Sequence, residues 1–382
     1  MLLEKYAPAY LTNWGAAYRG DSLDLLAALP DSSVNLVLTS PPFALQREKE
    51  YGNKAQTEYV AWLAQFARLV YRKLKDDGSF VLDLGGAYEP GSPTRSLYNF
   101  RVPIYFCDEL GFHLAEDFYW HNPAKLPSPI EWVNKRKLRA KDSVNTIWWF
   151  GKTRWPKANV SKVLTEYSDR MKKLLENPGA FYTPTKRPSG HDIGKAFGKD
   201  NGGAIPPNLL QISNSESNGS YLRGCKTVGV KGHPARFPSK LPEFFIRFLT
   251  EPGDLVVDIF AGSNTTGCVA ECEGRKWIAF EERLDYLAAS SFRFYTDAVT
   301  DAELKTAHDA ILHGKTADLR RDVFQVPQLP PRNGNIHRLA TPSQGALVLA
   351  ESATALIAQR KHLSKPVSYK RRVNSKRVRN EK

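Results

Sequence analysis

A hydroxyl group, two prolines and an aromatic ring follow a predicted strand near the start of the chain. The segment is Thr39-Ser40-Pro41-Pro42-Phe43. Residues 34–38 before it are mostly apolar and predict a short buried strand. Neither proline has an N–H group, and Ser40 is biased away from helical angles because a proline follows it. The sequence therefore predicts a rigid loop in which the carbonyl groups of Ser40 and Pro41 face no local donor.

This loop is suited to a flat substrate that carries an amino group, because it offers fixed acceptors and a ring that can stack. In open α/β sheets, ligands bind beyond the carboxyl ends of the strands, where the loop falls. A proline-rich turn that only ends a core strand explains the same residues. Asp21 leaves a similar choice: it either caps a predicted helix over residues 23–29 or accepts a hydrogen bond from a ligand amine.

A glycine-containing loop lies between two predicted strands in the second half of the chain. Residues 255–260 form the first strand, residues 261–267 the loop, and residues 277–281 the second strand, with a helix between. This order is typical of nucleotide cofactor sites. The unit contains neither G-x-G-x-x-G nor a Gly-Lys-Ser/Thr phosphate loop, so we expect a cofactor with an adenosine ribose but no pyrophosphate. Gly262 would permit close approach to the backbone, and Glu281 would accept both ribose hydroxyls.

Alternating helical and strand patterns before this unit predict an α/β domain. Apolar residues recur at helical spacing over residues 59–74, and a second helical pattern covers residues 100–110. Residues 80–84 between them form a predicted buried strand. Two aromatic runs, residues 118–120 and 147–150, are also typical of strands.

Cations interleave with aromatic residues between these two aromatic strands. Lys135, Arg136, Lys137 and Arg139 follow Trp132. The pattern fits a loop that contacts phosphate groups. A solvated basic surface is the commoner explanation of such a run, and nothing in the neighbouring residues excludes it.

The composition is that of a globular protein with a basic tail. The chain has 382 residues, of which 42% are hydrophobic, and a net charge of +14. Residues 360–382 contain ten Lys or Arg and one Glu, which fits a polyanionic partner. No apolar run is long enough to span a bilayer, and the first residues lack a signal-peptide pattern. The four cysteines show no metal-binding spacing, so we expect reduced thiols, no metal site and a cytoplasmic location.

Periodicity weakens over residues 151–232, where Gly, Pro, Asn and Ser dominate. A structureless insert of this length is uncommon in a compact domain unless it is functional. Polar and basic side chains on loops are also the ones that read base edges. A disordered linker is the alternative, and the embedded Phe181, Tyr182, Leu209 and Tyr221 argue against full disorder.

Three motifs resemble those of the DNA amino-methyltransferases. Residues 258–263 (DIFAGS) resemble the S-adenosylmethionine motif, and residues 39–43 (TSPPF) resemble the catalytic motif in the serine form typical of cytosine-N4 enzymes. Residues 233–238 (HPARFP) resemble the remaining cofactor motif. The catalytic motif comes first, which is the order of the permuted beta class. Residues 44–53 and 189–219 are similar to PvuII-type cytosine-N4 methyltransferases.

This resemblance covers roughly residues 11–315 and implies an α/β fold. The expected architecture is a permuted Rossmann-like methyltransferase sheet of seven mostly parallel strands, one of them antiparallel, with an inserted target-recognition region. The implied divisions are a catalytic half over 1–150, the target-recognition region over 151–232, a cofactor half over 233–315, a linker with a short helical segment over 316–357, and a basic tail over 358–382 that we expect to be disordered.

The resemblance and the patterns above together assign roles to individual residues. Catalysis is assigned to Ser40, Pro41, Pro42 and Phe43. S-adenosylmethionine binding is assigned to Asp21, Phe237, Pro238, Ser239, Asp258, Phe260, Gly262, Ser263, Asn264, Thr265 and Glu281. DNA contacts are assigned to Lys135, Arg136, Lys137, Arg139, His191, Asn214 and Ser215.

The implied chemistry is methyl transfer to a cytosine that has left the duplex. Phe43 would stack on the base, while the Ser40 hydroxyl and the Pro41 carbonyl accept hydrogen bonds from its exocyclic amine. This holds the nitrogen for direct transfer. No Pro-Cys dipeptide occurs in the sequence, which disfavours a carbon-5 enzyme with a cysteine nucleophile.

The resemblance further implies the palindrome CAGCTG in double-stranded DNA as the target. It also implies a monomer in the bacterial cytoplasm, with a restriction endonuclease as functional partner. Three alternatives remain: an adenine-N6 methyltransferase, which usually has Asp or Asn in place of Ser40; an inactive DNA-binding relative; and a methyltransferase that acts on RNA or protein.

Overall fold

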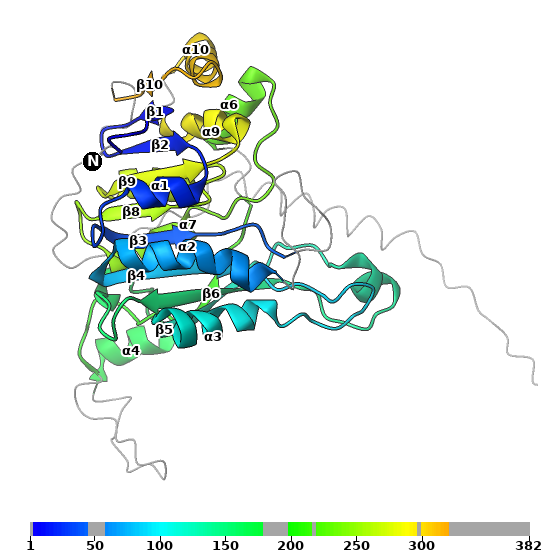
Figure 1. Cartoon of the computed structure of the whole chain (residues 1–382). Coiled ribbons are helices and arrows are strands. Elements are labelled where there is room, and N and C mark those ends of the chain that lie inside the picture. The colour runs from blue at the N-terminus through cyan, green and yellow to red at the C-terminus, as the bar shows by residue number, and fades with distance from the viewer. Residues whose placement is uncertain (1–2, 45–57, 179–197, 216–218, 296–298, 321–382) are drawn as a thin grey trace, which may run out of the picture. The chain divides into compact units, whose positions relative to one another are not determined.

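The computed structural model describes residues 3–44, 58–178, 198–215, 219–295 and 299–320 (Figure 1). The predicted DNA contact His191, residues 45–53 of the PvuII-type similarity and the basic tail lie outside this part of the chain. Within it, no helix is both long and apolar enough to cross a membrane.

A single ten-stranded sheet organises the described chain, in the order β10-β1-β2-β9-β8-β3-β4-β6-β5-β7. Its seven central strands are β2 (Gly15–Arg19), β9 (Lys276–Glu281), β8 (Leu255–Asp258), β3 (Val34–Thr39), β4 (Leu74–Leu84), β6 (Val144–Gly151) and β5 (His113–His121). Of these seven, β6 alone is antiparallel to its neighbours. The predicted seven-stranded, mostly parallel sheet is therefore confirmed.

Three short strands extend this sheet beyond the prediction. They are β1 (Tyr10–Leu11), β10 (Ala317–Asp318) and β7 (Leu209–Gln211). Segments of two or three residues carry no periodic pattern, so the sequence does not reveal them. Strand β10 pairs with β1, so the sheet continues past residue 315, where we had expected a linker to begin.

The register of the central strands joins the two halves of the chain. Strand β8 lies between β9 and β3, with Val256 opposite Leu36 and Val257 opposite Val37. Strand β2 pairs with β9, which sets Arg19 opposite Glu281. Because these strands are parallel, the loops after β2, β3, β8 and β9 open onto one edge of the sheet.

Helices cover both faces of the sheet (Figure 1). The helices α1 (Ser22–Ala28), α2 (Tyr59–Lys73) and α3 (Tyr98–Leu110) pack on one face. On the other face lie α7 (Lys240–Leu249), α8 (Thr265–Cys272), α9 (Leu284–Ser290), α6 (Ser220–Val228) and α10 (Asp301–Leu312). Side chains of β3 contribute to both cores: Val34 and Val37 to one, Leu36 and Leu38 to the other.

Two element boundaries differ from the prediction. Helix α2 ends at Lys73, and the strand we expected over residues 80–84 begins already at Leu74. Its pairing with β3 is irregular at the start: Val34 lies opposite Leu74, but Leu36 lies opposite Ser79. The buried Lys73 ammonium donates to the Leu29 carbonyl at 2.6 Å and to Asp31 at 2.7 Å. This fastens the end of α2 to the loop after α1.

The insert over residues 151–232 contains regular structure that its polar composition concealed. It holds a short helix, α4 (Asp169–Glu176), and the strand β7. Helix α6 buries Tyr221 and Cys225 in the core beside Phe292. Gly224 of the same helix contacts Phe292 so closely that a Cβ atom would lie 2.4 Å from its ring. At least this part of the insert belongs to the packed body.

Candidate active site

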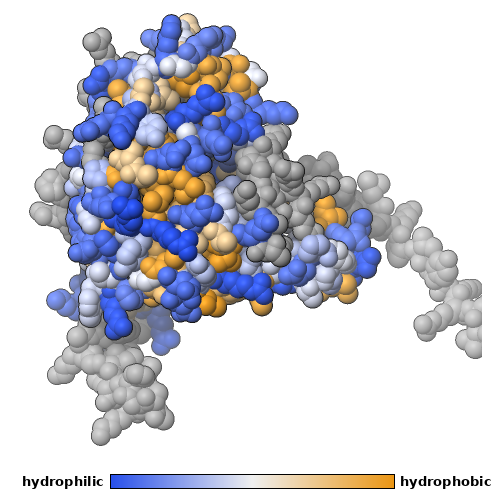
Figure 2. Space-filling model, in the orientation of Figure 1, coloured by the Kyte–Doolittle hydropathy of each residue, from blue (hydrophilic) through white to orange (hydrophobic). Residues whose placement is uncertain are grey.

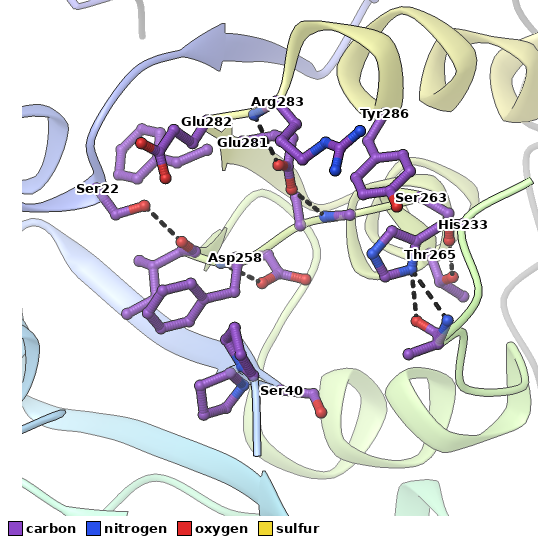
Figure 3. Close-up of a pocket in the computed structure, with 18 of the residues that line it drawn as sticks. Ser22, Ser40, His233, Asp258, Ser263, Thr265, Glu281, Glu282, Arg283 and Tyr286 are labelled. Carbon is purple, nitrogen blue, oxygen red and sulfur yellow. Dashed lines mark hydrogen bonds between the residues drawn. The ribbon is translucent and has the colours of Figure 1, made fainter. Parts of the chain in front are cut away.

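A cavity of about 530 Å³ opens at the carboxyl edge of the central strands (Figure 3). The loops after β2, β3, β8 and β9 supply its walls. The sequence-predicted residues that line it are Asp21, Ser40, Pro41, Pro42, Phe43, Phe237, Asp258, Phe260, Gly262, Ser263, Thr265 and Glu281. The structure therefore brings the predicted catalytic loop and the predicted cofactor loop into one site.

Asp258 at the end of β8 links these two loops. Its Oδ1 accepts hydrogen bonds from Thr39 Oγ1 at 2.7 Å and from the Phe260 N–H at 3.1 Å, and its Oδ2 accepts one from Thr266 Oγ1 at 2.7 Å. The residue is 2% exposed. Burial raises the pKa of Asp258, and the three donors counteract that rise. The carboxylate thus fixes the start of the catalytic loop against the start of α8.

Glu281 at the end of β9 is the second acid of the cavity. Its Oε2 accepts the Gly262 N–H at 2.8 Å, and its Oε1 accepts the Arg283 N–H at 2.9 Å (Figure 3). Burial is the main reason that the pKa of Glu281 rises to about 7. Gly262 has a φ of 52°, and a Cβ atom there would lie 3.1 Å from the His233 ring, so the loop requires glycine at this position.

A third acid, Asp83, lies behind the catalytic loop and was not predicted. Ser40 Oγ donates to its Oδ2 at 3.1 Å, and Asn145 Nδ2 donates to its Oδ1 at 3.3 Å. Asp83 is buried, and this desolvation raises its pKa to about 6. No motif in the sequence singles it out, because it lies inside the apolar strand β4 and its partner is distant along the chain.

Neighbouring residues hold the catalytic loop in place. Tyr59 on α2 donates its hydroxyl hydrogen to the Pro42 carbonyl at 2.9 Å. The Phe43 ring lies against Gly85, where a Cβ atom would come within 2.5 Å of it. Glycine at this position therefore makes room for the ring.

Asp21 lies both at the cap of α1 and in the wall of the cavity. Its Oδ1 accepts the Leu23 N–H at 2.8 Å, so it is the N-cap of that helix. The same residue also lines the cavity. Both interpretations of Asp21 therefore remain compatible with the structure.

Three predicted cofactor residues do not line the cavity. Asn264 supports the loop from behind: it caps α8 through the Gly267 N–H at 3.0 Å and donates to the Tyr10 hydroxyl at 2.9 Å. Ser239 occupies the N-cap position of α7, and Pro238 precedes it in a buried position. Other residues of the motif over residues 233–238 do line the cavity, among them His233, Arg236 and Phe237.

Several wall residues escaped prediction because their pattern matches that of a helix core. Trp62 and Phe66 of α2 pack on Phe260, with ring centroids 5.7 Å and 5.0 Å away. Elsewhere in the wall, the ring centroids of Tyr286 and His233 lie 4.5 Å apart. The Arg283 guanidinium lies over the Tyr286 ring, 4.4 Å from its centroid. The cavity is thus more aromatic than the sequence motifs suggest.

Those predicted DNA contacts that the structure describes lie outside the cavity. Lys135 and Arg136 both pair with Glu131, at 3.1 Å and 3.0 Å. The Arg139 guanidinium lies over the Tyr88 ring at 4.3 Å. In the insert, Asn214 Nδ2 donates to the Arg236 carbonyl at 2.7 Å. These contacts hold the protein's own loops together.

Two further predicted DNA contacts lie at the protein surface. Lys137 is exposed, with a φ of 55°, and Ser215 is exposed at the end of a described segment. In the described residues no cluster of three or more side chains could hold a metal ion.

The sequence matches a protein-family model described as DNA methylase over residues 34–292. This chain belongs to the DNA methylase family. The match spans the catalytic loop, the insert and the cofactor loop, so all three lie within the methylase domain.

Individual methylases agree with this assignment. The type II methyltransferase M.PvuII of Proteus hauseri is 67% identical over 312 residues, which cover 82% of this chain and 93% of that protein. M.ScaI of Streptomyces caespitosus is 27% identical over 293 residues, which cover 76% and 84%. A solved structure described as PvuII DNA methyltransferase (cytosine-N4-specific) superimposes with a TM-score of 0.69 at 56% identity, and covers 83% of this chain and 99% of that one.

The methylase fold, the DNA methyltransferase activity and the S-adenosylmethionine cofactor predicted from the sequence are confirmed. The cavity suits this cofactor. Glu281 offers a carboxylate to ribose hydroxyls, Phe260 offers an aromatic face, and Gly262 keeps the backbone of the loop clear of side chains. A sheet-edge cavity with one acid at the end of the second strand is also the usual nucleotide-binding arrangement.

Replacing Thr266 with valine should destabilise this methylase, and more so at high pH. The variant keeps the side-chain shape but removes the donor to Asp258 Oδ2, which costs about 1–3 kcal/mol. The pKa of Asp258, already raised by burial, should rise further. Between the unfolded pKa and a higher folded pKa the native state binds more protons, so the free energy of unfolding falls as the pH rises through that interval.

Urea unfolding at about pH 5 and about pH 8 measures this effect. We expect a larger loss of unfolding free energy for Thr266→Val at the higher pH. Thr306→Val, on the exposed side of α10, is the matched control and should stay within about 0.5 kcal/mol of the wild type. An equal loss at both pH values would contradict the role given to the Asp258–Thr266 hydrogen bond.

Proposed function

We propose that this methylase acts on the exocyclic N4 amine of cytosine in double-stranded DNA. The observation that carries the proposal is the hydrogen bond from Ser40 to Asp83. Because the hydroxyl hydrogen of Ser40 is directed at Asp83 Oδ2, the lone pairs of Ser40 Oγ can accept from an amine N–H. Phe43 lines the same cavity and offers its ring to a base.

Individual residues of this chain can then be assigned to the steps of the transfer. Phe43 stacks on the cytosine, and Ser40 Oγ and the Pro41 carbonyl accept from its amine, which directs the nitrogen lone pair into the cavity. S-adenosylmethionine, when bound, would supply an electrophilic methyl group; the bond from its sulfur to that methyl would break, and S-adenosylhomocysteine would be the leaving group. After the N–C bond forms, the nitrogen releases one proton. Ser40 Oγ takes this proton as its own passes to Asp83 Oδ2.

Asp83 suits this role as proton acceptor. With a pKa of about 6 it is ionised at neutral pH, yet it is basic enough to take up a proton during the reaction. Asn145 fixes the orientation of the carboxylate from the other side. Asp83 acts through Ser40, so we assign it a positioning and proton-holding role.

We further propose that residues 151–232 select the DNA sequence, since the catalytic loop contacts one extruded base and leaves its neighbours unread. The 67% identity to M.PvuII supports the palindrome CAGCTG, methylated on the inner cytosine. The protein would act as a monomer, because one catalytic loop serves one extruded base. Its location would be the bacterial cytoplasm. Its functional partner would be the restriction endonuclease that cuts the same site.

Ser40→Ala should reduce methyl transfer by roughly a hundredfold or more while leaving S-adenosylmethionine affinity near the wild-type value. The reason is that Ser40 contacts the base amine and Asp83 but none of the proposed ribose contacts. At saturating S-adenosylmethionine, wild-type single-turnover rates should fall as the pH drops through about 6, where Asp83 becomes protonated. In Asp83→Asn this acid limb should disappear.

Rapid-quench transfer of labelled methyl groups over a pH series tests both statements. Lys305→Ala, exposed on α10 and outside residues 151–232, is the control and should retain the wild-type profile. An unchanged acid limb in Asp83→Asn, or a Ser40→Ala variant as fast as the wild type, would contradict the assigned roles.

Cofactor affinity should weaken as the pH falls through about 7. Ribose hydroxyls donate to an ionised carboxylate, so binding favours the deprotonated form of Glu281. One pH unit below that pKa only about a tenth of the sites are ionised, so we expect a roughly tenfold loss of affinity between about pH 8 and about pH 6. Calorimetric titration measures it. In Glu281→Gln binding should be weaker and lack this pH dependence; an identical slope would exclude Glu281 as the cause.

Plasmid DNA from cells that express the protein should resist an endonuclease that cuts CAGCTG. A base-pair mismatch typically costs about 1–3 kcal/mol, so a site changed at one position should stay largely sensitive to its own endonuclease. Plasmid from cells that express Ser40→Ala is the control and should be cut. Complete cutting of wild-type DNA that has taken up labelled methyl groups would overturn the site assignment and leave the methylase activity in place.

A further inference from the structure

An arm projects from the active-site edge of the sheet (Figure 1). It comprises residues 122–143, which join β5 to β6. At its base, the Asn122 N–H donates to the Ser143 carbonyl at 2.9 Å. Two residues further, Asn145 donates to Asp83, the partner of Ser40. The arm therefore starts beside the groups that we assign to catalysis.

A second loop braces the arm. Arg95, from the loop between β4 and α3, pairs with Asp142 of the arm at 3.2 Å. The Tyr88 ring of the same loop receives the guanidinium of Arg95 at 5.4 Å and that of Arg139 at 4.3 Å. These contacts show that the arm has a defined conformation of its own.

The surface of the arm is both basic and apolar. Leu126, Ile130 and Leu138 are 80%, 61% and 62% exposed. Figure 2 shows apolar surface on this projection next to hydrophilic surface. Residues 122–143 contain six Lys or Arg against two acids, so the arm complements a polyanion.

Phosphate binding by the basic side chains does not by itself explain the surface of the arm. Lys135 and Arg136 share Glu131, and Arg139 is engaged with Tyr88. Lys137 is exposed, but several of the other cations are thus engaged within the protein, whereas Leu126, Ile130 and Leu138 are all more than half exposed. Proteins that open a duplex often insert such side chains between base pairs, where they replace lost stacking.

We propose that the arm inserts Leu126, Ile130 or Leu138 into the base stack beside the extruded cytosine. This inference rests on the proposed function, because only an enzyme that extrudes its base leaves such a gap. The occupant of this surface is therefore duplex DNA, and the cations of the arm favour its approach. The apolar side chains lower the free energy of the opened duplex, so they act on extrusion and leave methyl transfer itself unchanged.

The test compares two duplexes that carry CAGCTG. In one, guanine is opposite the target cytosine; in the other, an abasic site replaces that guanine, so no pair has to be broken. The variant carries Leu126→Ala, Ile130→Ala and Leu138→Ala. Ile104→Ala, which truncates a 60% exposed side chain on α3, outside the arm, the cavity and residues 151–232, is the matched control. Single-turnover methylation rates are measured for all proteins, and thermal unfolding verifies that each is folded.

We expect the triple variant to methylate the paired duplex at least roughly tenfold more slowly than the wild type, because unstacking costs a few kcal/mol. On the abasic duplex its rate should approach that of the wild type. Ile104→Ala should match the wild type on both. Equal rates for the variant and the wild type on the paired duplex, or an equal loss on both duplexes, would overturn the proposal.

Two further outcomes separate this inference from the proposed function. If the wild type methylates neither duplex, the proposed site or chemistry fails. If the substitutions leave both rates unchanged but alter the molecular mass measured by light scattering, the arm is a contact between copies of this chain, and the insertion proposal is overturned.

Discussion

The buried carboxylate of Asp258 is the constraint on which the site depends. A charged group cannot be withdrawn from water without donors to replace it, and the donors here come from three different segments. Thr39 ends the strand before the catalytic loop, Phe260 belongs to the cofactor loop, and Thr266 starts the helix after it. Residues far apart in the sequence are thereby held at one edge of the sheet. The permuted order of the motifs has no effect on this geometry, because strand pairing alone sets β8 next to β3.

Two further acids with raised pKa values, Asp83 and Glu281, lie around this centre. Burial raises the pKa of Asp83 to about 6 and that of Glu281 to about 7. Each carboxylate accepts hydrogen bonds from two donors held in place by the fold. Asp83 faces the catalytic loop through Ser40, whereas Glu281 faces the cofactor loop through Gly262. Perturbed acids in one cavity are typical of active sites. Here the same burial that raises the pKa values also keeps the polar contacts of the cavity strong.

Much of this could be predicted from the sequence, because short motifs with fixed turn chemistry carry it. The prolines after Ser40 and the glycine loop after Asp258 define loops at strand ends, and parallel pairing brings strand ends together. Asp83 and Trp62 could not be predicted, since each lies within an ordinary strand or helix pattern and gains its role from a distant partner. Likewise, the pairing of Lys135 with Glu131 depends on how the arm folds. Helix α6 was concealed by the polar residues around it, although Tyr221 had signalled buried structure.

The most direct test of the chemistry is the identity of the methylated base. DNA that contains CAGCTG is incubated with the purified protein and isotope-labelled S-adenosylmethionine, digested to nucleosides and analysed by mass spectrometry. The geometry of Ser40, Phe43 and Asp83 predicts N4-methyldeoxycytidine as the labelled product. Label in N6-methyldeoxyadenosine or in 5-methyldeoxycytidine instead would contradict it.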